Sequence, residues 1–405
     1  MTIFIDGRRV TVAEGTRVLD ALRANAVEVP TLCYLKELGE IGACRLCLVE
    51  VKGCERLVSA CQSRVWEGME IFTHSERVRA ARRRNLRLIL SRHDAQCLTC
   101  ERNGKCQLQT LAQRFGLEGP SPHSTRPLRI KADHTLPVVR NDARCVHCLR
   151  CVGVCARMQG ANVWDLLGVG SHARVGVRGA RTLAEAGCTF CGQCVLACPV
   201  SALNERDDSA RFLDAVREKR KIVVSLSPAL KRFIAAFHRL GIMVLNADHV
   251  RASAVRAQLA QAGVVLSTRC PAVVRLVKHE FPDLTSYLST VPALPRPIGI
   301  DSDVFCVAVD PCLAGKDSGG VDLVLTDREI ERVFSQLGIE TQSLPNEPFD
   351  GEETTDEEVA RCISQVYGPK EVRQFLLDLR AGRVNRESVE LWVCSHCVRS
   401  YDILS

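Results

Sequence analysis

The sequence lacks any run of about 18 consecutive apolar residues, so we expect no segment that spans a bilayer. Its N-terminus has an acid and two arginines where a secretory signal needs an apolar stretch. It also lacks a glycine-rich fingerprint behind a long apolar strand, so no flavin or NAD site is indicated. These absences predict a soluble, cytoplasmic chain with no membrane partner.

Aromatic residues are also scarce, at 5% of the 405 residues, and none interleave with the arginines of residues 77–92. Surfaces that bind single-stranded nucleic acid usually combine basic side chains with aromatic rings. The net charge of +7 therefore does not indicate a nucleic-acid partner. We interpret residues 77–92 as a helix with a solvated basic face.

Cysteine, in contrast, is abundant, with 22 residues. Thiols stay reduced in the cytoplasm, so these cysteines indicate bound metal rather than disulfides. Most of them fall into four groups, each with its own spacing. Cys54, Cys306 and Cys362 fit no group and are expected to pack as small apolar residues.

The most specific group consists of two copies of the pattern Cys-x2-Cys-x2-Cys-x3-Cys. Such tandem runs bind two [4Fe–4S] clusters, and the fourth cysteine of each run binds the other cluster. Zinc is disfavoured because it prefers two separated Cys-x2-Cys pairs. The predicted ligand sets are Cys145, Cys148, Cys151 and Cys198 for one cluster, and Cys188, Cys191, Cys194 and Cys155 for the other.

The first group along the chain resembles a plant-type [2Fe–2S] site, in which a close cysteine pair precedes a distant last ligand. Its members are Cys33, Cys44, Cys47 and Cys61. Alternating residues around Asp6-Gly7 predict a β-hairpin over residues 2–12. Periodicity predicts a helix over 16–26 and strands over 48–51 and 56–59. Such an arrangement of hairpin, helix and further strands is a β-grasp.

A second group combines one histidine with three cysteines, His93, Cys97, Cys100 and Cys106. The loop 101–105 supplies no fourth thiolate, and imidazole is a suitable donor for iron. We therefore predict a [4Fe–4S] cluster with His93 as its fourth ligand.

These three groups, in this order, resemble the N-terminal half of the large subunit of [FeFe]-hydrogenases and the matching subunit of respiratory NADH dehydrogenase. The segments that carry the resemblance are residues 30–33, 42–51, 104–109 and 191–199. Further along, residues 225–232, 267–271, 310–316, 321–329 and 390–397 resemble the catalytic domain of the hydrogenases.

That resemblance implies a fifth site. Position by position, Cys270, Cys312, Cys394 and Cys397 match the ligands of the cubane part of the hydrogenase H-cluster. A [4Fe–4S] cluster is favoured, while a [2Fe–2S] cluster, zinc or an empty site remain open because the spacing is also compatible with zinc.

The departures from the hydrogenase pattern concern the diiron part of the H-cluster. Arg269 stands in place of the proton-relay cysteine, Gly315 replaces the lysine that holds a diiron cyanide, and Asp310 replaces a methionine. Lys316 is displaced by one position, and the chain ends shortly after a last motif that is one residue short and lacks its glycines. We predict no diiron subsite and no catalytic residues.

The predicted fold is multidomain α+β. In the second half, short β-like runs at 222–226, 264–267, 304–309 and 323–326 alternate with amphipathic helices, which indicates an α/β arrangement there. The predicted domains are a β-grasp [2Fe–2S] domain (1–75), a small helical His-ligated [4Fe–4S] domain (76–135), a bacterial 2×[4Fe–4S] ferredoxin domain (136–212) and a truncated α/β iron-hydrogenase-like domain (213–405).

The resemblance implies an electron-transfer subunit of a soluble NAD(P)H- and ferredoxin-linked, flavin-based electron-bifurcating oxidoreductase, similar to a Sporomusa-type transhydrogenase. The implied partners are a flavin- and NADH-binding subunit, a small [2Fe–2S] subunit, an additional NADP-linked or other oxidoreductase subunit, and ferredoxin. The alternatives are an active divergent [FeFe]-hydrogenase, a subunit of a formate or aldehyde dehydrogenase complex, and an iron–sulfur assembly factor. Assembly factors of this type lack modules like those of residues 1–110.

Overall fold

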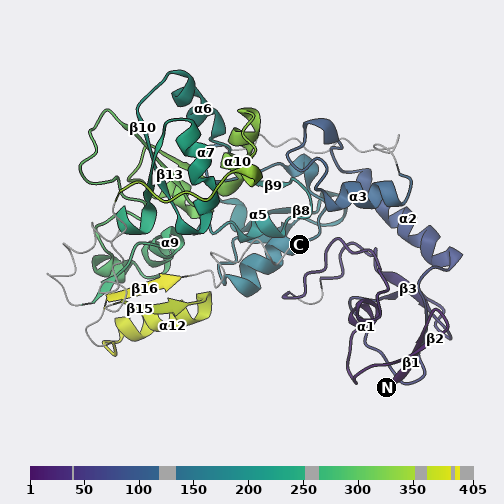
Figure 1. The fold of residues 1–405 in the computed structure, drawn as a ribbon. Helices are drawn as coiled ribbons and strands as arrows, with labels where there is room; N and C mark the ends of the chain where they lie inside the picture. The colour runs from purple at the N-terminus through teal and green to yellow at the C-terminus, as the bar shows by residue number, and fades with distance from the viewer. Residues whose placement is uncertain (39–40, 118–133, 251–263, 352–362, 385–387, 393–405) are drawn as a thin grey trace.

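The computed structural model describes residues 1–38, 41–117, 134–250, 264–351, 363–384 and 388–392. Helices and strands are mixed throughout, as predicted. A five-stranded sheet lies at one end of the molecule and a four-stranded sheet toward the other, with the cysteine-rich segments between them (Figure 1). In these described segments no helix has the length and apolar character needed to cross a membrane.

The N-terminal hairpin forms as predicted. Strands β1 (Thr2–Ile5) and β2 (Arg8–Thr11) pair antiparallel, and Asp6 and Gly7 have φ angles of 47° and 84°. Two left-handed residues are what a tight two-residue turn with the twist of the strands requires. Helix α1 (Val18–Ala24) follows and is shorter than predicted, because Ala26 turns left-handed at a φ of 57°.

The rest of this sheet brings cysteines into its core. Strands β3 (Leu48–Val51), β4 (Val58–Ser59) and β5 (Glu70–Phe72) give the order β2-β1-β5-β3-β4, in which only the β1–β5 pair is parallel. The apolar face of α1 packs on the sheet, and Cys47 and Cys61 lie in the same buried cluster. The predicted strands at 48–51 and 56–59 are thus confirmed within two residues.

Helix α2 (Glu76–Leu90) confirms the predicted arginine-rich helix, and its arginines have different surroundings. Arg82 is only 4% exposed and donates from Nε and one Nη to the carbonyl of Leu48, at 3.0 and 2.7 Å. Arg79 and Arg87 are exposed. The helix is therefore fixed to β3 by a buried guanidinium and solvated on its other side. Helix α3 (Gln107–Arg114) lies beyond it.

The central region consists of two small ribbons and short helices. The pair β6 (Val138–Arg140) and β9 (Leu203–Glu205) is antiparallel, as is the pair β7 (Trp164–Leu167) and β8 (Arg174–Val177). The two cysteine runs continue into α4 (Arg150–Gly153) and α5 (Gln193–Ala197).

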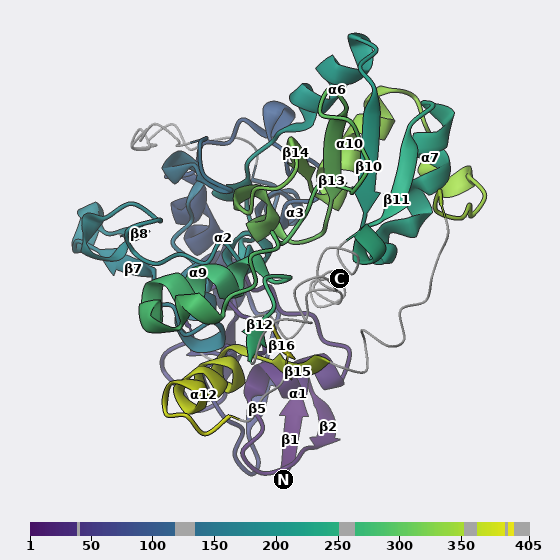
Figure 2. The same cartoon turned by 90° about the vertical axis from the view of Figure 1, so that its left-hand side faces the viewer.

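The last region contains two parallel sheets, seen from a second side in Figure 2. One has the order β11-β10-β13-β14 and the other β12-β16-β15. The predicted strands at 222–226, 264–267, 304–309 and 323–326 are confirmed within two residues. The strands are β10 (Ile222–Leu226), β11 (Met243–Asn246), β12 (Val265–Leu266), β13 (Phe305–Val309), β14 (Leu323–Leu325), β15 (Ile363–Tyr367) and β16 (Ser388–Trp392). The helices are α6 (Ser209–Arg217), α7 (Ile234–Arg239), α9 (Pro271–Glu280), α10 (Asp327–Gln336) and α12 (Pro369–Arg380).

His238, in the last turn of α7, fastens the segment that follows α10. Its Nδ1 meets Glu347, and its Nε2 lies 3.0 Å from Asp350, which also accepts from the Val244 amide at 2.7 Å. Burial would lower the pKa of His238, but the two carboxylates outweigh burial and raise it. A raised folded-state pKa stabilises the fold below the ordinary histidine pKa, and this stabilisation is lost as pH rises through the raised value.

We therefore expect the variant His238→Gln to lose about 1 kcal/mol of unfolding free energy at about pH 5.5, and less at about pH 9. Urea unfolding at both pH values measures the difference. An equal loss at both would mean that the imidazole acts by packing rather than by charge.

Candidate metal centres

The eight cysteines of the tandem runs line two separate cavities. The first has a volume of about 390 Å³, including its open mouth, and the second about 340 Å³. Each cavity has three cysteines from one run and the fourth from the other run, which is the partition that the spacing predicts. The first is lined by Cys145, Cys148, Cys151 and Cys198, and the second by Cys155, Cys188, Cys191 and Cys194.

The two runs share an unusual backbone. His147 and Phe190 precede the second cysteine of their runs with φ angles of 51° and 53°, and Leu149 and Gly192 follow it with 62° and 76°. Left-handed residues other than glycine are uncommon and strained. The same pair of reversals in both runs folds each loop around its cavity, so that successive cysteines face the same space.

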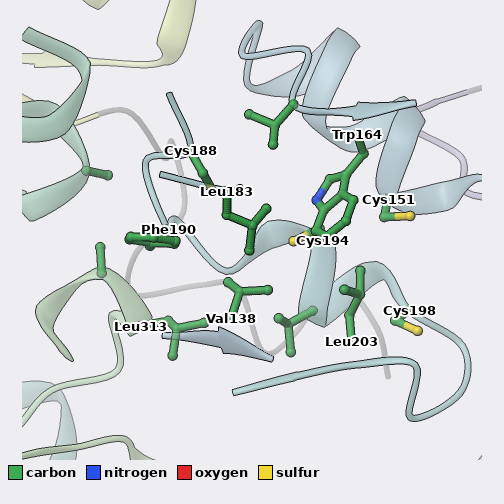
Figure 3. Packing of buried hydrophobic residues seen from close by; sticks show 14 of the residues in the cluster. Val138, Cys151, Trp164, Leu183, Cys188, Phe190, Cys194, Cys198, Leu203 and Leu313 are labelled. Atoms are coloured by element: carbon green, nitrogen blue, oxygen red, sulfur yellow. The ribbon is translucent and has the colours of Figure 1, made fainter. Parts of the chain in front are cut away.

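A tryptophan lies between the two cavities. Trp164 lines both of them and is only 2% exposed. Figure 3 shows its indole between Cys151 and Cys194, with Cys188 and Cys198 further out. The guanidinium of Arg140 lies over the ring, 5.3 Å from its centre. The wall between the two sites is therefore formed by a buried aromatic ring.

Burial governs the chemistry of these thiols. It raises the pKa of Cys148 and of Cys188 to about 12, and it raises the pKa of Cys151 and of Cys194 well above the ordinary thiol value. A thiol in such surroundings is inert as a nucleophile but becomes a thiolate when a metal ion replaces its proton. Four thiols around a cavity with a mostly apolar lining suit an iron–sulfur cluster.

The four cysteines of the first group also come together. The Cys44 amide lies 3.5 Å from the Cys33 sulfur, and the sulfurs of Cys47 and Cys61 are 3.4 Å apart. A hydrogen bond within each pair lowers the pKa of Cys33 to about 6 and of Cys47 to about 7, while the pKa of each partner is raised. Arg45 is left-handed at a φ of 52°, so the loop between Cys44 and Cys47 also turns inward.

His93 is oriented by the next module. Its Nδ1 lies 3.0 Å from the carbonyl of Arg144, and because a carbonyl only accepts, Nδ1 carries the hydrogen. Burial lowers the pKa of His93, which keeps the ring neutral. Nε2 is then the nitrogen with a lone pair for a metal, the usual arrangement of a metal-binding histidine.

The three cysteines of this second group are less enclosed. Cys106 is buried just before α3, with its sulfur 3.9 Å from the carbonyl of Pro199. Cys97 and Cys100 are half-buried, and burial, with a smaller contribution from nearby Cys100, raises the pKa of the Cys106 thiol. The structure therefore brings Cys100 and Cys106 close together, while the His93 ring meets the carbonyl of Arg144.

The fifth site is described only in part. Cys270 is 2% exposed and immediately precedes α9, and Cys312 is half-buried, with its amide donating to Asp310 Oδ1 at 2.7 Å. The turn Leu313–Asp317 packs against α9. Cys394 and Cys397 lie outside the described residues, two and five positions beyond the end of β16.

The residues that depart from the hydrogenase pattern have specific contacts. Arg269 forms an ion pair with Asp248. A side chain on Gly315 would meet the Leu294 side chain at 3.1 Å, a tight contact even for a methyl group. Lys316 is fully buried and forms ion pairs with Asp208 and Glu329, each at 2.8 Å.

The cysteines outside the groups pack as predicted where they are described. Cys306 is 1% exposed on β13, and Cys54 is half-buried against the N-terminal core. Cys362 lies outside the described residues. Within the described ranges, no three His, Cys, Asp or Glu side chains come close enough together to hold a single metal ion. In a [4Fe–4S] cluster each ligand binds its own iron atom, and in a [2Fe–2S] cluster two ligands bind each iron atom, so the four ligands need not converge on one point.

Two arginines that the sequence did not single out connect the centres. Arg150 lies within the first run and donates to the carbonyl of Tyr34, next to Cys33, at 3.0 Å. Arg275, on α9, donates from Nε to the carbonyl of Cys188 at 2.9 Å and lies 4.2 Å from the centre of the Phe190 ring. The position of Arg150 could have drawn attention to it, because it is a charged residue inside a cysteine run. Arg275 has no such position.

Four protein families match parts of the chain. Residues 1–76 match a 2Fe-2S iron-sulfur cluster binding domain, and residues 82–120 match the NADH-ubiquinone oxidoreductase-G iron-sulfur binding region. Residues 185–204 match a 4Fe-4S binding domain, and residues 227–364 match the C-terminal domain of the iron only hydrogenase large subunit. The chain therefore contains a [2Fe–2S] domain and [4Fe–4S]-binding domains.

Relatives are found among subunits of oxidoreductases. The NADP-reducing hydrogenase subunit HndD of Solidesulfovibrio fructosivorans is 30% identical over 418 residues, covering 86% of this chain and 71% of the relative. The NADPH-Fe(3+) oxidoreductase subunit alpha of Geobacter sulfurreducens is 34% identical over 205 residues, covering 50% of this chain and 24% of the relative. Among solved structures, an NAD+-reducing [NiFe]-hydrogenase in the H2-reduced state is 26% identical with a TM-score of 0.44, covering 51% of this chain and 88% of the other.

Proposed function

This chain belongs to the family of hydrogenase-like iron–sulfur subunits that includes the NADP-reducing hydrogenase subunit HndD, and from this premise we propose that it transfers electrons within a multi-subunit NAD(P)-linked oxidoreductase. The observation that carries the proposal is that neighbouring candidate centres are joined by direct contacts. Arg150 joins the first group to the tandem runs, His93 and Cys106 join the second group to them, and Arg275 joins them to α9.

We propose one [2Fe–2S] and three [4Fe–4S] clusters, which supply one-electron transfer when bound. The buried thiols, the left-handed loops and the neutral His93 support these assignments. The finer domain scheme, including a β-grasp over residues 1–75, belongs to the same proposal. The proposed ligand sets are Cys33, Cys44, Cys47 and Cys61; His93, Cys97, Cys100 and Cys106; Cys145, Cys148, Cys151 and Cys198; and Cys188, Cys191, Cys194 and Cys155.

A further [4Fe–4S] cluster at Cys270, Cys312, Cys394 and Cys397 is proposed as the end of this path. Strands β12 and β16 run parallel and adjacent, so their carboxyl ends lie at the same edge of the sheet. Cys270 follows the first of these strands and Cys394 follows the second. This topology supports a common site for cysteines that are distant in the sequence.

We propose that this region has no diiron subsite and no hydrogen chemistry. The observed contacts of Arg269 and Lys316 support this, because both side chains already hold carboxylates of the surrounding protein. The crowding at Gly315 supports it as well, since the lysine of the hydrogenases would not fit beside Leu294 without rearrangement.

The specific partners are also part of the proposal. We propose a flavin- and NADH-binding subunit, a small [2Fe–2S] subunit, an additional NADP-linked or other oxidoreductase subunit, and ferredoxin, with flavin-based bifurcation as in transhydrogenases. The names of the relatives support the NAD(P) link, since they include an NADP-reducing hydrogenase subunit and an NADPH-Fe(3+) oxidoreductase subunit.

We expect the reconstituted chain to bind about 14 iron atoms, or about 18 with the fifth cluster, and to evolve no H2 from a reduced viologen after anaerobic maturation. Iron analysis and gas chromatography measure the two quantities. A count well below 14 would refute the proposed path. Viologen-dependent H2 evolution would establish a divergent hydrogenase instead.

A further inference from the structure

Arg150 is a buried charge between two of the candidate centres. Its side chain lies in the first cysteine run, between Cys148 and Cys151, yet it reaches the N-terminal module at Tyr34. The residue is only 3% exposed. One Nη donates to the Tyr34 carbonyl at 3.0 Å, and the other donates to Gln107 Oε1 at 3.2 Å.

The hydrogen bonds of Arg150 leave its charge without a conventional partner. Both acceptors are neutral, and Nε is buried without any hydrogen-bond partner. Throughout the described part of the chain, no carboxylate forms an ion pair with this guanidinium. A guanidinium stays protonated in proteins, and a buried charge is costly unless an opposite charge lies nearby.

The nearby groups that can carry negative charge are cysteine thiolates on two sides. Cys33 and Cys44 of the first group and Cys148 and Cys198 of the first cavity are the groups whose negative charge favours the charged guanidinium. These residues belong to two different ligand sets, the first group and the first cavity. Low-dielectric surroundings strengthen such interactions. The same cation therefore faces both centres.

We propose that Arg150 is a shared electrostatic positioning residue that raises the reduction potentials of the two centres on either side of it. The inference rests on the proposed function, because it requires clusters at both sites. Each site gains one electron on reduction and loses it on oxidation, which makes the reduced form the more negative one. A fixed cation stabilises the more negative form, and no proton needs to move because the guanidinium keeps its charge.

The test is the variant Arg150→Gln in the reconstituted full-length chain, with EPR-monitored redox titration. At the potential that half-reduces each wild-type centre, we expect the ratio of reduced to oxidised centre to fall about tenfold, or about 59 mV for one electron. This shift is expected for the [2Fe–2S] signal and for one [4Fe–4S] signal, while the remaining clusters keep their potentials.

Arg157→Gln is a matched control. Arg157 lies two residues beyond the last cysteine of the same run and donates to another carbonyl of the N-terminal module, that of Leu38. The two variants thus lose the same charge and a similar contact between modules, but Arg157 is not among the charges that act on the thiols of Cys148 or Cys33. We expect Arg157→Gln to leave all potentials unchanged.

A second variant separates charge from packing. Arg150→Lys keeps the charge but loses the planar donor group, so its potentials should stay near the wild-type values even if Arg150→Gln fails to assemble. A shift in Arg150→Lys as large as in Arg150→Gln, a shift in only one centre, or an equal shift in Arg157→Gln would overturn the inference. A wild-type chain without the two clusters, shown by its iron count, would instead refute the proposed function.

Discussion

Replacing Cys198 by Ser is expected to remove about four iron atoms per chain and to remove them from the site of the other cysteine run. Cys198 belongs by sequence to the run that begins at Cys188, but it lines the cavity of Cys145, Cys148 and Cys151. A serine hydroxyl is a much poorer ligand for iron than a thiolate. Iron analysis gives the loss, and EPR or Mössbauer spectroscopy of the reduced protein gives its type.

Double variants identify which site is lost. If Cys198 and Cys145 serve one cluster, the double Ser variant should lose no more iron than Cys198→Ser alone, because residues that act as a unit are not additive. The double variant with Cys188→Ser should instead lose about eight iron atoms. The matched control is Cys155→Ser, the fourth cysteine of the first run, which lines the cavity of Cys188. Combined with Cys188→Ser it should lose about four iron atoms, and combined with Cys145→Ser about eight. The reverse pattern would show that each run holds its own cluster.

The division of the eight cysteines between two cavities is the feature of this region that the sequence predicts best, while their role as ligands stays a prediction. The spacing of each run places three cysteines in one short loop, and this arrangement does not depend on contacts with distant residues. The same holds for the hairpin at Asp6-Gly7 and for the strands of the last region, where residue type and period depend on near neighbours.

Contacts between modules could not be predicted in the same way. Arg150 is only one charged residue among 54 Lys and Arg in the sequence, and its importance depends on Tyr34 and Gln107 lying beside it. Arg275 likewise gains its position from the loop of Cys188. These pairs are separated by many residues, and nothing local in the sequence specifies them.

The contacts of Lys316 could not be predicted from the sequence either. The sequence indicates that it is displaced by one position from the lysine of the hydrogenases, but not where its amine lies. The structure places the amine among Asp208, Glu329 and the carbonyl of Val324. Glu329 also accepts from the amides of Asp208 and Thr326, at 2.6 and 2.7 Å. Lys316 therefore links the carboxylate that precedes α6 to one within α10, and Arg206 forms a second ion pair with Asp208.

We expect Lys316→Met to lower the unfolding free energy of the last region by about 3–5 kcal/mol, because it leaves the buried Glu329 carboxylate without its cation, while Asp208 keeps its ion pair with Arg206. Burial would raise the pKa of Asp208, but hydrogen bonds with Lys316 and Arg206 outweigh burial and lower it. Loss of the lysine removes the larger of these contributions. Urea unfolding followed by circular dichroism measures the change.

The control for this variant is Arg332→Met, which removes a cation from α10, the helix that carries Glu329. Arg332 is 41% exposed and contacts Glu205 and Asp207 at 3.9 and 3.2 Å, so its loss should cost only about 0–1 kcal/mol. If Lys316→Met were as mild as this control, the amine would not be the counter-charge of the buried Glu329 carboxylate. The argument that Lys316 is committed to the fold, and so cannot replace the lysine of a diiron site, would then fail as well.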